Sequence, residues 1–202
     1  MPVFLNGAAF RKASCNGTAL QRIFFNGAPV WSGRFIVVGA GAAYTGGTML
    51  VQQPNGGTAT CSGDTSYWKA SVQSRESVWG NSDAAVFTAV KLPTSQYSKL
   101  TVTWEHYAPD QYATHGVSHF GLTDSTQIIY HSGYPSGGFL DEKFVSKTGT
   151  DNGWSTDEID LSDVDSDHYL GMIVSSGAGG LESFRSSASA NLIILSNEKI
   201  SV

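Results

Sequence analysis

The sequence predicts an all-β protein, in which a small N-terminal antiparallel β-meander precedes a jelly-roll-like β-sandwich. An Asn-Gly dipeptide recurs three times at a spacing of ten residues near the N-terminus. Short strand-like segments, punctuated by Gly, Pro, Asn, Asp and Ser, then fill the rest of the chain. Charged residues make up only 14% of the 202 residues, and no long apolar helical periodicity is present. Such a pattern is typical of a sandwich or jelly roll.

The N-terminal repeats Asn6-Gly7, Asn16-Gly17 and Asn26-Gly27 predict three tight turns. Asn-Gly is the strongest short hairpin signal, because a type I′ turn needs positive φ at both central residues. Residues 8–15 and 18–25 lie between successive turns and have the length of ordinary strands. The simplest structure is one four-stranded meander over residues 1–33.

Two-residue turns fix the register of this meander and set Phe10 opposite Ile23 and Ile23 opposite Val30. One face then collects apolar residues, whereas the other also carries large apolar side chains. We expect that second face to be an assembly face, packed on the chain's own sandwich or on another subunit: Phe4, Leu20, Phe24 and Trp31.

Residues 34–202 contain the segments expected to form the sandwich. Leu100, Val102 and Trp104 alternate with polar residues, which indicates a strand with one wet face. The expected strands are Phe35–Val38, Met49–Gln52, Trp68–Gln73, Ala85–Leu92, Leu100–Tyr107, Val117–Leu122, Gln127–Tyr130, Phe139–Val145, Glu158–Leu161, Tyr169–Val174 and Ala188–Leu195.

Composition and charge disfavour several classes of partner. The net charge of −5 argues against nucleic acid as a partner. The N-terminus lacks the pattern of a signal peptide, and no run of about 18 apolar residues predicts a membrane span. Cys15 and Cys61 are the only cysteines and imply no disulfide framework.

Motifs for a bound nucleotide or metal are incomplete. The stretch FIVVGAGAAYTGG places Tyr44 where a dinucleotide-binding loop needs Gly or Ala. His115 and His119 have the spacing of zinc ligands on a helix, but residues four apart on a strand are about 13 Å apart. DVDSDH resembles the start of a calcium loop, although the later Gly and Glu are missing, so its acidic residues are weak calcium candidates: Asp163, Asp165 and Asp167.

No catalytic motif predicts an enzyme. The Gly-x-Ser-x-Gly pattern of a nucleophile elbow is missing. Glu105, Asp141 and Glu142 could belong to a glycosidase pair, but nothing in their spacing selects two of the 17 acidic residues. We therefore expect a non-enzymatic protein without a cofactor.

Several aromatic residues lie in loop-like contexts rich in Gly, Ser and Asn. An exposed aromatic ring offers an apolar face to a sugar, and nearby polar groups bind the hydroxyls. The alternative is that these rings cover loop ends or line subunit contacts. The candidate glycan-contacting residues are Trp79, Tyr112, Tyr134 and Trp154.

The array FLNGAAF…CNGTAL…FFNGAPVW resembles the N-terminal Asn-Gly repeats of tail and fibre-type virion proteins from phages of Gram-positive bacteria. The stretch STDEIDLSDVDSDHYLGMIVSSG…SSASANLIILSNEKI is similar to the last strands of jelly-roll domains often attached to them. The resemblance covers the first thirty residues and about the last fifty, and it brings no defined site.

This resemblance implies a structural virion protein of a tail, fibre or capsid surface. Its expected location is the virion, and its expected partners are other virion proteins, a second copy of itself in a homo-oligomer, and host cell-surface carbohydrate. A capsid-decoration protein would share these features. The alternative is a carbohydrate-binding module without a virion role.

Overall fold

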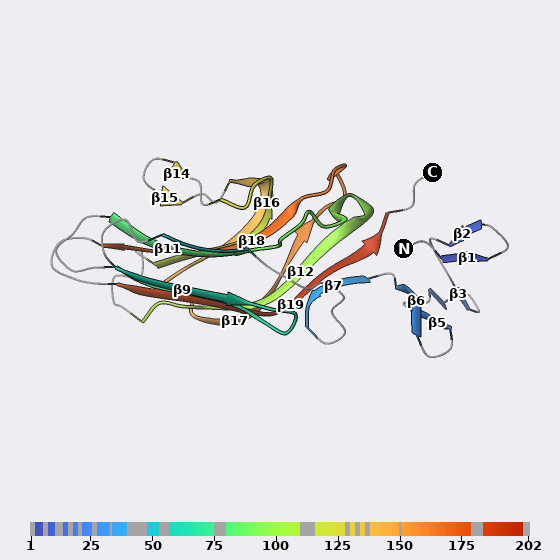
Figure 1. The fold of residues 1–202 in the computed structure, drawn as a ribbon, viewed down its shortest axis with the longest axis horizontal. Coiled ribbons are helices and arrows are strands. Elements are labelled where there is room, and N and C mark those ends of the chain that lie inside the picture. The colour runs from blue at the N-terminus through green and yellow to red at the C-terminus, as the bar shows by residue number, and fades with distance from the viewer. Residues whose placement is uncertain are drawn as a thin grey trace.

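A computed structural model describes the chain in segments. The described residues are the strands between residues 3 and 32, then 34–39, 48–52, 57–74, 80–109, 116–127, 130–131, 134–135, 138–149, 151–178 and 184–199. From residue 34 onward, eleven of the strands form two antiparallel sheets stacked face to face (Figure 1), so the predicted all-β sandwich is confirmed. Among them no helix is long and apolar enough to cross a membrane.

The first sheet of the sandwich has six strands. In order across the sheet they are β17 (Gly153–Asp160), β12 (Tyr97–Tyr107), β19 (Arg185–Glu198), β10 (Trp68–Gln73) and β9 (Thr58–Gly63). The sixth strand, β7 (Arg34–Val38), pairs with the C-terminal half of β19, beyond the stretch that pairs with β10.

The second sheet has five strands. They are β16 (Phe139–Thr148), β13 (Gly116–Thr123), β18 (Tyr169–Ala178), β11 (Gly80–Phe87) and β8 (Thr48–Gln52). A short hairpin, β14 (Tyr130–His131) with β15 (Tyr134–Pro135), lies between β13 and β16 in the chain. One 3-10 turn, η1 (Thr94–Gln96), precedes β12.

The strand pairing identifies the sandwich as a jelly roll. β10 pairs with β19, β11 with β18, β12 with β17, and β13 with β16, so the chain folds as one long hairpin whose two arms pair. Successive strands of each arm alternate between the two sheets. This wrapping gives the two Greek keys of an eight-stranded jelly roll, to which β7, β8 and β9 add edges.

The core lies between the sheets and is centred on three aromatic residues. Trp68 and Trp104 come from the six-stranded sheet and Phe120 from the five-stranded sheet, and all three are fully buried. The ring of Phe120 lies 6.4 Å from Trp68 and 6.2 Å from Trp104, both tilted. Buried and half-buried residues alternate along β12, as the sequence pattern predicts.

The N-terminal Asn-Gly repeats join hairpins, but the predicted four-stranded meander is wrong. β1 (Val3–Leu5) pairs with β2 (Ala8–Phe10), β3 (Ser14–Cys15) with β4 (Thr18–Ala19), and β5 (Arg22–Phe25) with β6 (Ala28–Ser32). These are three separate two-stranded sheets, and none of their described strands pairs with the sandwich. Among the described residues, 8–15 and 18–25 each hold two short strands, and Phe10 does not pair with Ile23.

A bulge also corrects the register of the third hairpin. Phe25 faces Ala28 as predicted, but Ile23 faces Trp31 instead of Val30. A β-bulge adds one unpaired residue and reverses the alternation beyond it. Pro29, which has no N–H to donate to the ladder, lies beside this irregularity. Trp31 therefore leaves the register that grouped it with Phe24 on the predicted assembly face.

Three strands of the sandwich differ most from the sequence-based expectation. β17 covers residues 153–160 where residues 158–161 were expected, so Trp154 lies on a strand instead of in a loop. β9 was not predicted, because its sequence TATCSG contains few apolar residues. β11 covers residues 80–87, earlier than the expected 85–92. Its sequence GNSDAAVF begins with residues that are rare in strands, so propensity pointed to the apolar part that follows.

Candidate functional site

Trp154 is the one predicted glycan-contacting residue whose side chain is described. It lies near the start of β17, the edge strand of the six-stranded sheet, and is 50% exposed. Its cross-strand partner is Glu105, and Tyr107, 52% exposed, lies two residues further along β12. Diagonal neighbours on one face of an antiparallel pair are about 7–8 Å apart. The sheet therefore presents two exposed aromatic rings side by side.

These rings end two rows of side chains that cross the outer face of the six-stranded sheet. In each row, the residues face one another in register across neighbouring strands, and five of the nine residues in the two rows are Ser or Thr. We call the two rows the Trp154 face; the first is Ser62, Lys69, Ser189, Glu105 and Trp154, and the second is Thr60, Ser71, Ser187 and Tyr107. The first row crosses five strands, or about 19 Å at a strand spacing of ~4.8 Å.

The turn between β16 and β17 sets the position of Trp154. The carboxylate of Asp151 accepts hydrogen bonds from the backbone N–H of Thr148, at 2.9 Å, and from its hydroxyl, at 3.2 Å. The backbone bond contributes most to holding the pKa of Asp151 below its ordinary value. Gly153 has φ +110°, a backbone conformation that residues with a Cβ rarely adopt.

Asn152 ties this turn to the end of β12. Its side-chain oxygen accepts a hydrogen bond from the N–H of Ala108 at 2.7 Å, and its amide donates to the carbonyl of Ala108 at 3.2 Å. Ala108 follows Tyr107, and Asn152 comes two residues before Trp154. The two bonds therefore fix the two exposed rings relative to each other.

A buried lysine connects the same region to the second sheet. Lys147 of β16 points between the sheets and donates to the carbonyls of Trp104, at 3.1 Å, and Gly153, at 3.2 Å. Its ammonium lies 4.8 Å from the centre of the Trp104 ring. Burial lowers the pKa of Lys147, while the charges of Asp157, Asp151 and Glu105 oppose that shift.

The indole of Trp104 also fixes β17. Its Nε1–H donates to Asp157 at 2.6 Å, and the hydroxyl of Ser155 donates to the same carboxylate oxygen at 2.8 Å. Hydrogen bonds to a carboxylate are stronger than those between neutral groups. Trp154 thus projects from a strand that is anchored on both sides of it, which favours a preformed binding surface.

A second aromatic cluster lies on the outer face of the other sheet. Phe139 and Phe144 stack with centroids 5.5 Å apart, and His119 lies 6.0 Å and 5.8 Å from them. Nδ1 of His119 lies 2.6 Å from the hydroxyl of Ser146. This histidine contact, on strand β13, differs from the helical zinc geometry considered above, and His115 lies outside the described residues.

The three calcium candidates have different surroundings. Asp163 pairs with Lys143 at 2.5 Å, Asp167 accepts a hydrogen bond from the hydroxyl of Ser95 at 2.5 Å, and Asp165 is exposed. Within the described part of the chain, no group of three or more His, Cys, Asp or Glu residues could hold a metal ion.

The three carboxylates considered above for a glycosidase pair lie on different sheets. Glu105 belongs to β12 of the six-stranded sheet, whereas Asp141 and Glu142 belong to β16 of the five-stranded sheet. Glu142 has φ 59°, in the left-handed region. The fold therefore does not pair Glu105 with either residue across neighbouring strands.

The remaining predicted residues fall partly outside the structure. Trp79, Tyr112 and Leu20 lie outside the described residues, and Tyr134 belongs to β15, where the side chain is not described. Phe4, Phe24 and Trp31 belong to β1, β5 and β6, likewise without described side chains. Sequence reasoning missed Tyr107, although the alternation of residues 100–107 already places it on the wet face.

Comparison with known proteins gives likenesses of fold only. No protein-family profile matches the sequence, and no curated protein matches it. The family 11 carbohydrate-binding module of the cellulase Lic26A-Cel5E of Clostridium thermocellum is 11% identical, with a TM-score of 0.43 over 84% of this chain and 98% of that one.

Two other solved structures are similar to a comparable extent. The glycoside hydrolase domain of Endo-D from Streptococcus pneumoniae R6 is 17% identical with a TM-score of 0.39, and the match covers 77% of this chain but 22% of that one. The lectin UEA-II, in complex with galactose, is 12% identical with a TM-score of 0.35, over 81% and 97%. With every one of these TM-scores below 0.5, the likenesses support no functional inference for this chain.

Proposed function

We propose that the sandwich is a carbohydrate-binding domain that holds a glycan chain along the Trp154 face. The observation that supports this proposal most strongly is the pair of half-exposed rings, Trp154 and Tyr107, on one anchored sheet face. Large aromatic side chains left in water contribute little to folding and are typical of binding surfaces.

The chemistry of the face suits a sugar. A pyranose ring presents C–H groups that stack on an aromatic ring, and hydroxyls that donate and accept hydrogen bonds at its rim. Beside the rings, Glu105 supplies an acceptor and Ser187 a group that both donates and accepts, and Lys69 adds a donor further across the sheet. Because the rows extend across the sheet, the ligand we expect is a chain of several sugar units.

Binding to a panel of immobilised and soluble glycans tests this proposal. Each ring in contact with a sugar buries part of its remaining exposed area, worth about 1–2 kcal/mol, so Trp154→Ala and Tyr107→Ala should each weaken binding roughly 5- to 30-fold. Phe144→Ala is the matched control, since Phe144 is 40% exposed on the other sheet. Unchanged affinity in both variants, or no ligand in the panel, would contradict the proposal.

We further propose that the N-terminal hairpins attach the sandwich to a virion or to further copies of the chain. The supporting observation is that these three two-stranded sheets pair with no described strand of the sandwich. An isolated two-stranded hairpin is marginally stable in water, so a partner surface would stabilise all three. The phage tail, fibre or capsid surface expected from the sequence remains the proposed location.

Ultracentrifugation and particle analysis test the attachment. The full chain should be oligomeric, or should be found by mass spectrometry in purified phage particles, whereas residues 34–202 should be monomeric. Two monomeric forms, together with absence of the chain from particles, would refute the attachment without affecting glycan binding.

A further inference from the structure

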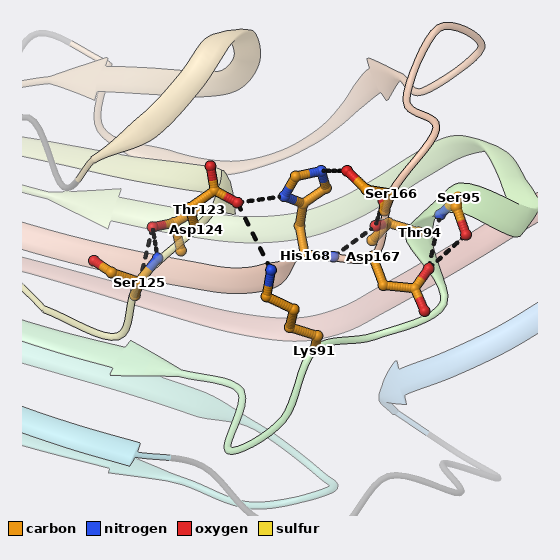
Figure 2. A network of polar contacts seen from close by, with 9 residues as sticks. All are labelled: Lys91, Thr94, Ser95, Thr123, Asp124, Ser125, Ser166, Asp167 and His168. Atoms are coloured by element: carbon orange, nitrogen blue, oxygen red, sulfur yellow. Dashed lines mark hydrogen bonds and ion pairs between the residues drawn. The ribbon is translucent and has the colours of Figure 1, made fainter.

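A serine, a histidine and an aspartate form a continuous chain of hydrogen bonds at one end of the sandwich (Figure 2). Nε2 of His168 lies 2.9 Å from the hydroxyl oxygen of Ser166, and Nδ1 lies 2.9 Å from Oδ1 of Asp124. Ser166 and His168 belong to the segment before β18, and Asp124 follows β13. Asp124 is 44 residues from His168 in the sequence, so the fold brings two separate segments together here.

The chemistry of the partners assigns the protons. An ionised carboxylate only accepts hydrogen bonds, so Nδ1 of His168 carries the proton that faces Asp124. In a neutral imidazole the other nitrogen then accepts, so the hydroxyl of Ser166 donates to Nε2. Lys91 lies 3.9 Å from the same oxygen of Asp124 and places a positive charge beside it. An Nε2 that accepts from the serine hydroxyl, with Nδ1–H directed at a carboxylate, is the arrangement that a histidine needs to remove a proton from serine.

The segment that carries Ser166 is held in place by the loop before β12. The hydroxyl of Thr94 donates to the carbonyl of Ser166 at 3.0 Å and accepts from the N–H of His168 at 2.9 Å. The N–H of Leu92 donates to the carbonyl of His168 at 2.8 Å, which adds a third tie. The serine is therefore presented by a fixed backbone, which catalysis requires of a nucleophile.

The histidine and the serine of this hydrogen-bonded group differ in their exposure to solvent. The side chain of His168 is only 7% exposed, so few rotamers are open to it, whereas Ser166 is exposed to solvent. His168 is thus held in one position, whereas the hydroxyl of Ser166 can be reached from solvent. An ester group that protrudes from a large molecule could therefore contact Ser166. A network that only orders the loop would share the distances, but it would give Ser166 no unusual reactivity.

We propose that Ser166, His168 and Asp124 form a nucleophilic triad that hydrolyses carboxylic esters. The oxygen of Ser166 bonds to the ester carbonyl carbon while His168 takes the hydroxyl proton. The carbon–oxygen bond to the alcohol then breaks, and the alcohol leaves with that proton. Water attacks the acyl-serine, passes a proton through His168 back to Ser166, and the carboxylic acid departs. This activity is independent of glycan binding.

The first test is covalent labelling of the full chain with a fluorophosphonate, followed by peptide mass spectrometry. The oxygen of Ser166 should bond to phosphorus with loss of fluoride, and Ser166→Ala should remove the adduct. Asp124→Asn keeps the shape of the orienting group but withdraws its charge, and should slow labelling at least about tenfold; in a complete triad that change costs about 10⁴-fold. Ser162→Ala, at another exposed serine of the same segment, should label like the wild type.

The second test is release of p-nitrophenol from p-nitrophenyl acetate. The wild type and Ser162→Ala should exceed Ser166→Ala, and an acetyl group should be found on Ser166 at early times. Absence of an adduct on Ser166, equal labelling rates in wild type and Asp124→Asn, or equal ester turnover in wild type and Ser166→Ala would each overturn the triad. Asp124 is exposed and Ser166 is small, so neither substitution removes packed core.

Discussion

His106 makes the stability of the sandwich depend on pH. It lies fully buried on β12, with Nδ1 2.8 Å from the hydroxyl of Ser118, and its Nε2 makes no hydrogen bond with the described residues. The pKa of His106 is lowered from 6.5 to about 4: burial contributes most, the nearby charge of Lys147 acts in the same direction, and Asp151 opposes the shift. The imidazole is therefore neutral in the folded protein at neutral pH.

The sign of the effect follows from proton binding. Between the folded pKa of about 4 and the unfolded value of 6.5, the unfolded chain binds the proton and the folded chain does not. Stability is thus fully present above 6.5 and falls as the pH drops toward 4. A difference of about 2.5 pKa units corresponds to at most about 3.4 kcal/mol, of which roughly 2.5 kcal/mol is lost by about pH 4.5.

His106→Asn isolates this contribution. Asparagine can still contact Ser118 but does not titrate, so the variant should lose roughly 2 kcal/mol less stability than the wild type between about pH 7.5 and 4.5. Urea unfolding at both pH values measures the difference. The carboxylates with lowered pKa, such as Asp160, lose their contribution below their ordinary value of 3.8, mostly outside this range.

His119→Asn provides the comparison within the same range. Burial also lowers the pKa of His119 to about 4, so His119→Asn should likewise lose less stability than the wild type over this range. An equal loss of stability in wild type and His106→Asn would refute the reasoning, because it would mean that His106 binds its proton equally in the folded and unfolded states.

Three further predictions concern packing and the domain boundary. A Cβ on Gly171 would lie 2.7 Å from Cε1 of the Phe87 ring, so Gly171→Ala should lower the free energy of unfolding by about 1–3 kcal/mol in thermal or urea denaturation. Asn152→Ala removes both bonds to Ala108, so it should cost about 1–3 kcal/mol of stability and also weaken glycan binding in the same titration. Residues 34–202 should fold alone with an all-β circular dichroism spectrum, because the sheets of the sandwich include no strand from the N-terminal hairpins; a disordered spectrum would contradict this.

Much of the fold follows from local sequence patterns. The Asn-Gly dipeptides predict the three N-terminal hairpins, because the turn conformation depends on the two residues themselves. Alternation over residues 100–107 predicts both β12 and its buried face. The bulge that skips Val30 in the register could not be predicted in this way, since it depends on how two strands pair and not on the pattern within either one.

The partners of the candidate site residues could not be predicted from the local sequence. Trp154 could be proposed from its context, but its partners Glu105 and Tyr107 lie nearly fifty residues earlier in the chain. The hydrogen bond between His168 and Asp124 spans 44 residues, and the sequence contains no motif that connects them.

The sequence by itself determined the all-β class, the pairing of the three N-terminal hairpins and the alternation of buried and exposed residues along β12. These features depend on backbone conformation and on the period of two along a strand, which neighbouring residues set. Only the tertiary structure decided which strands became neighbours, and therefore that Trp154 adjoins Glu105 and that Asp124 reaches His168. In a jelly roll, strands far apart in the chain pair, so the burial of both sheets against one core, and not any local preference, fixes the register that creates these sites.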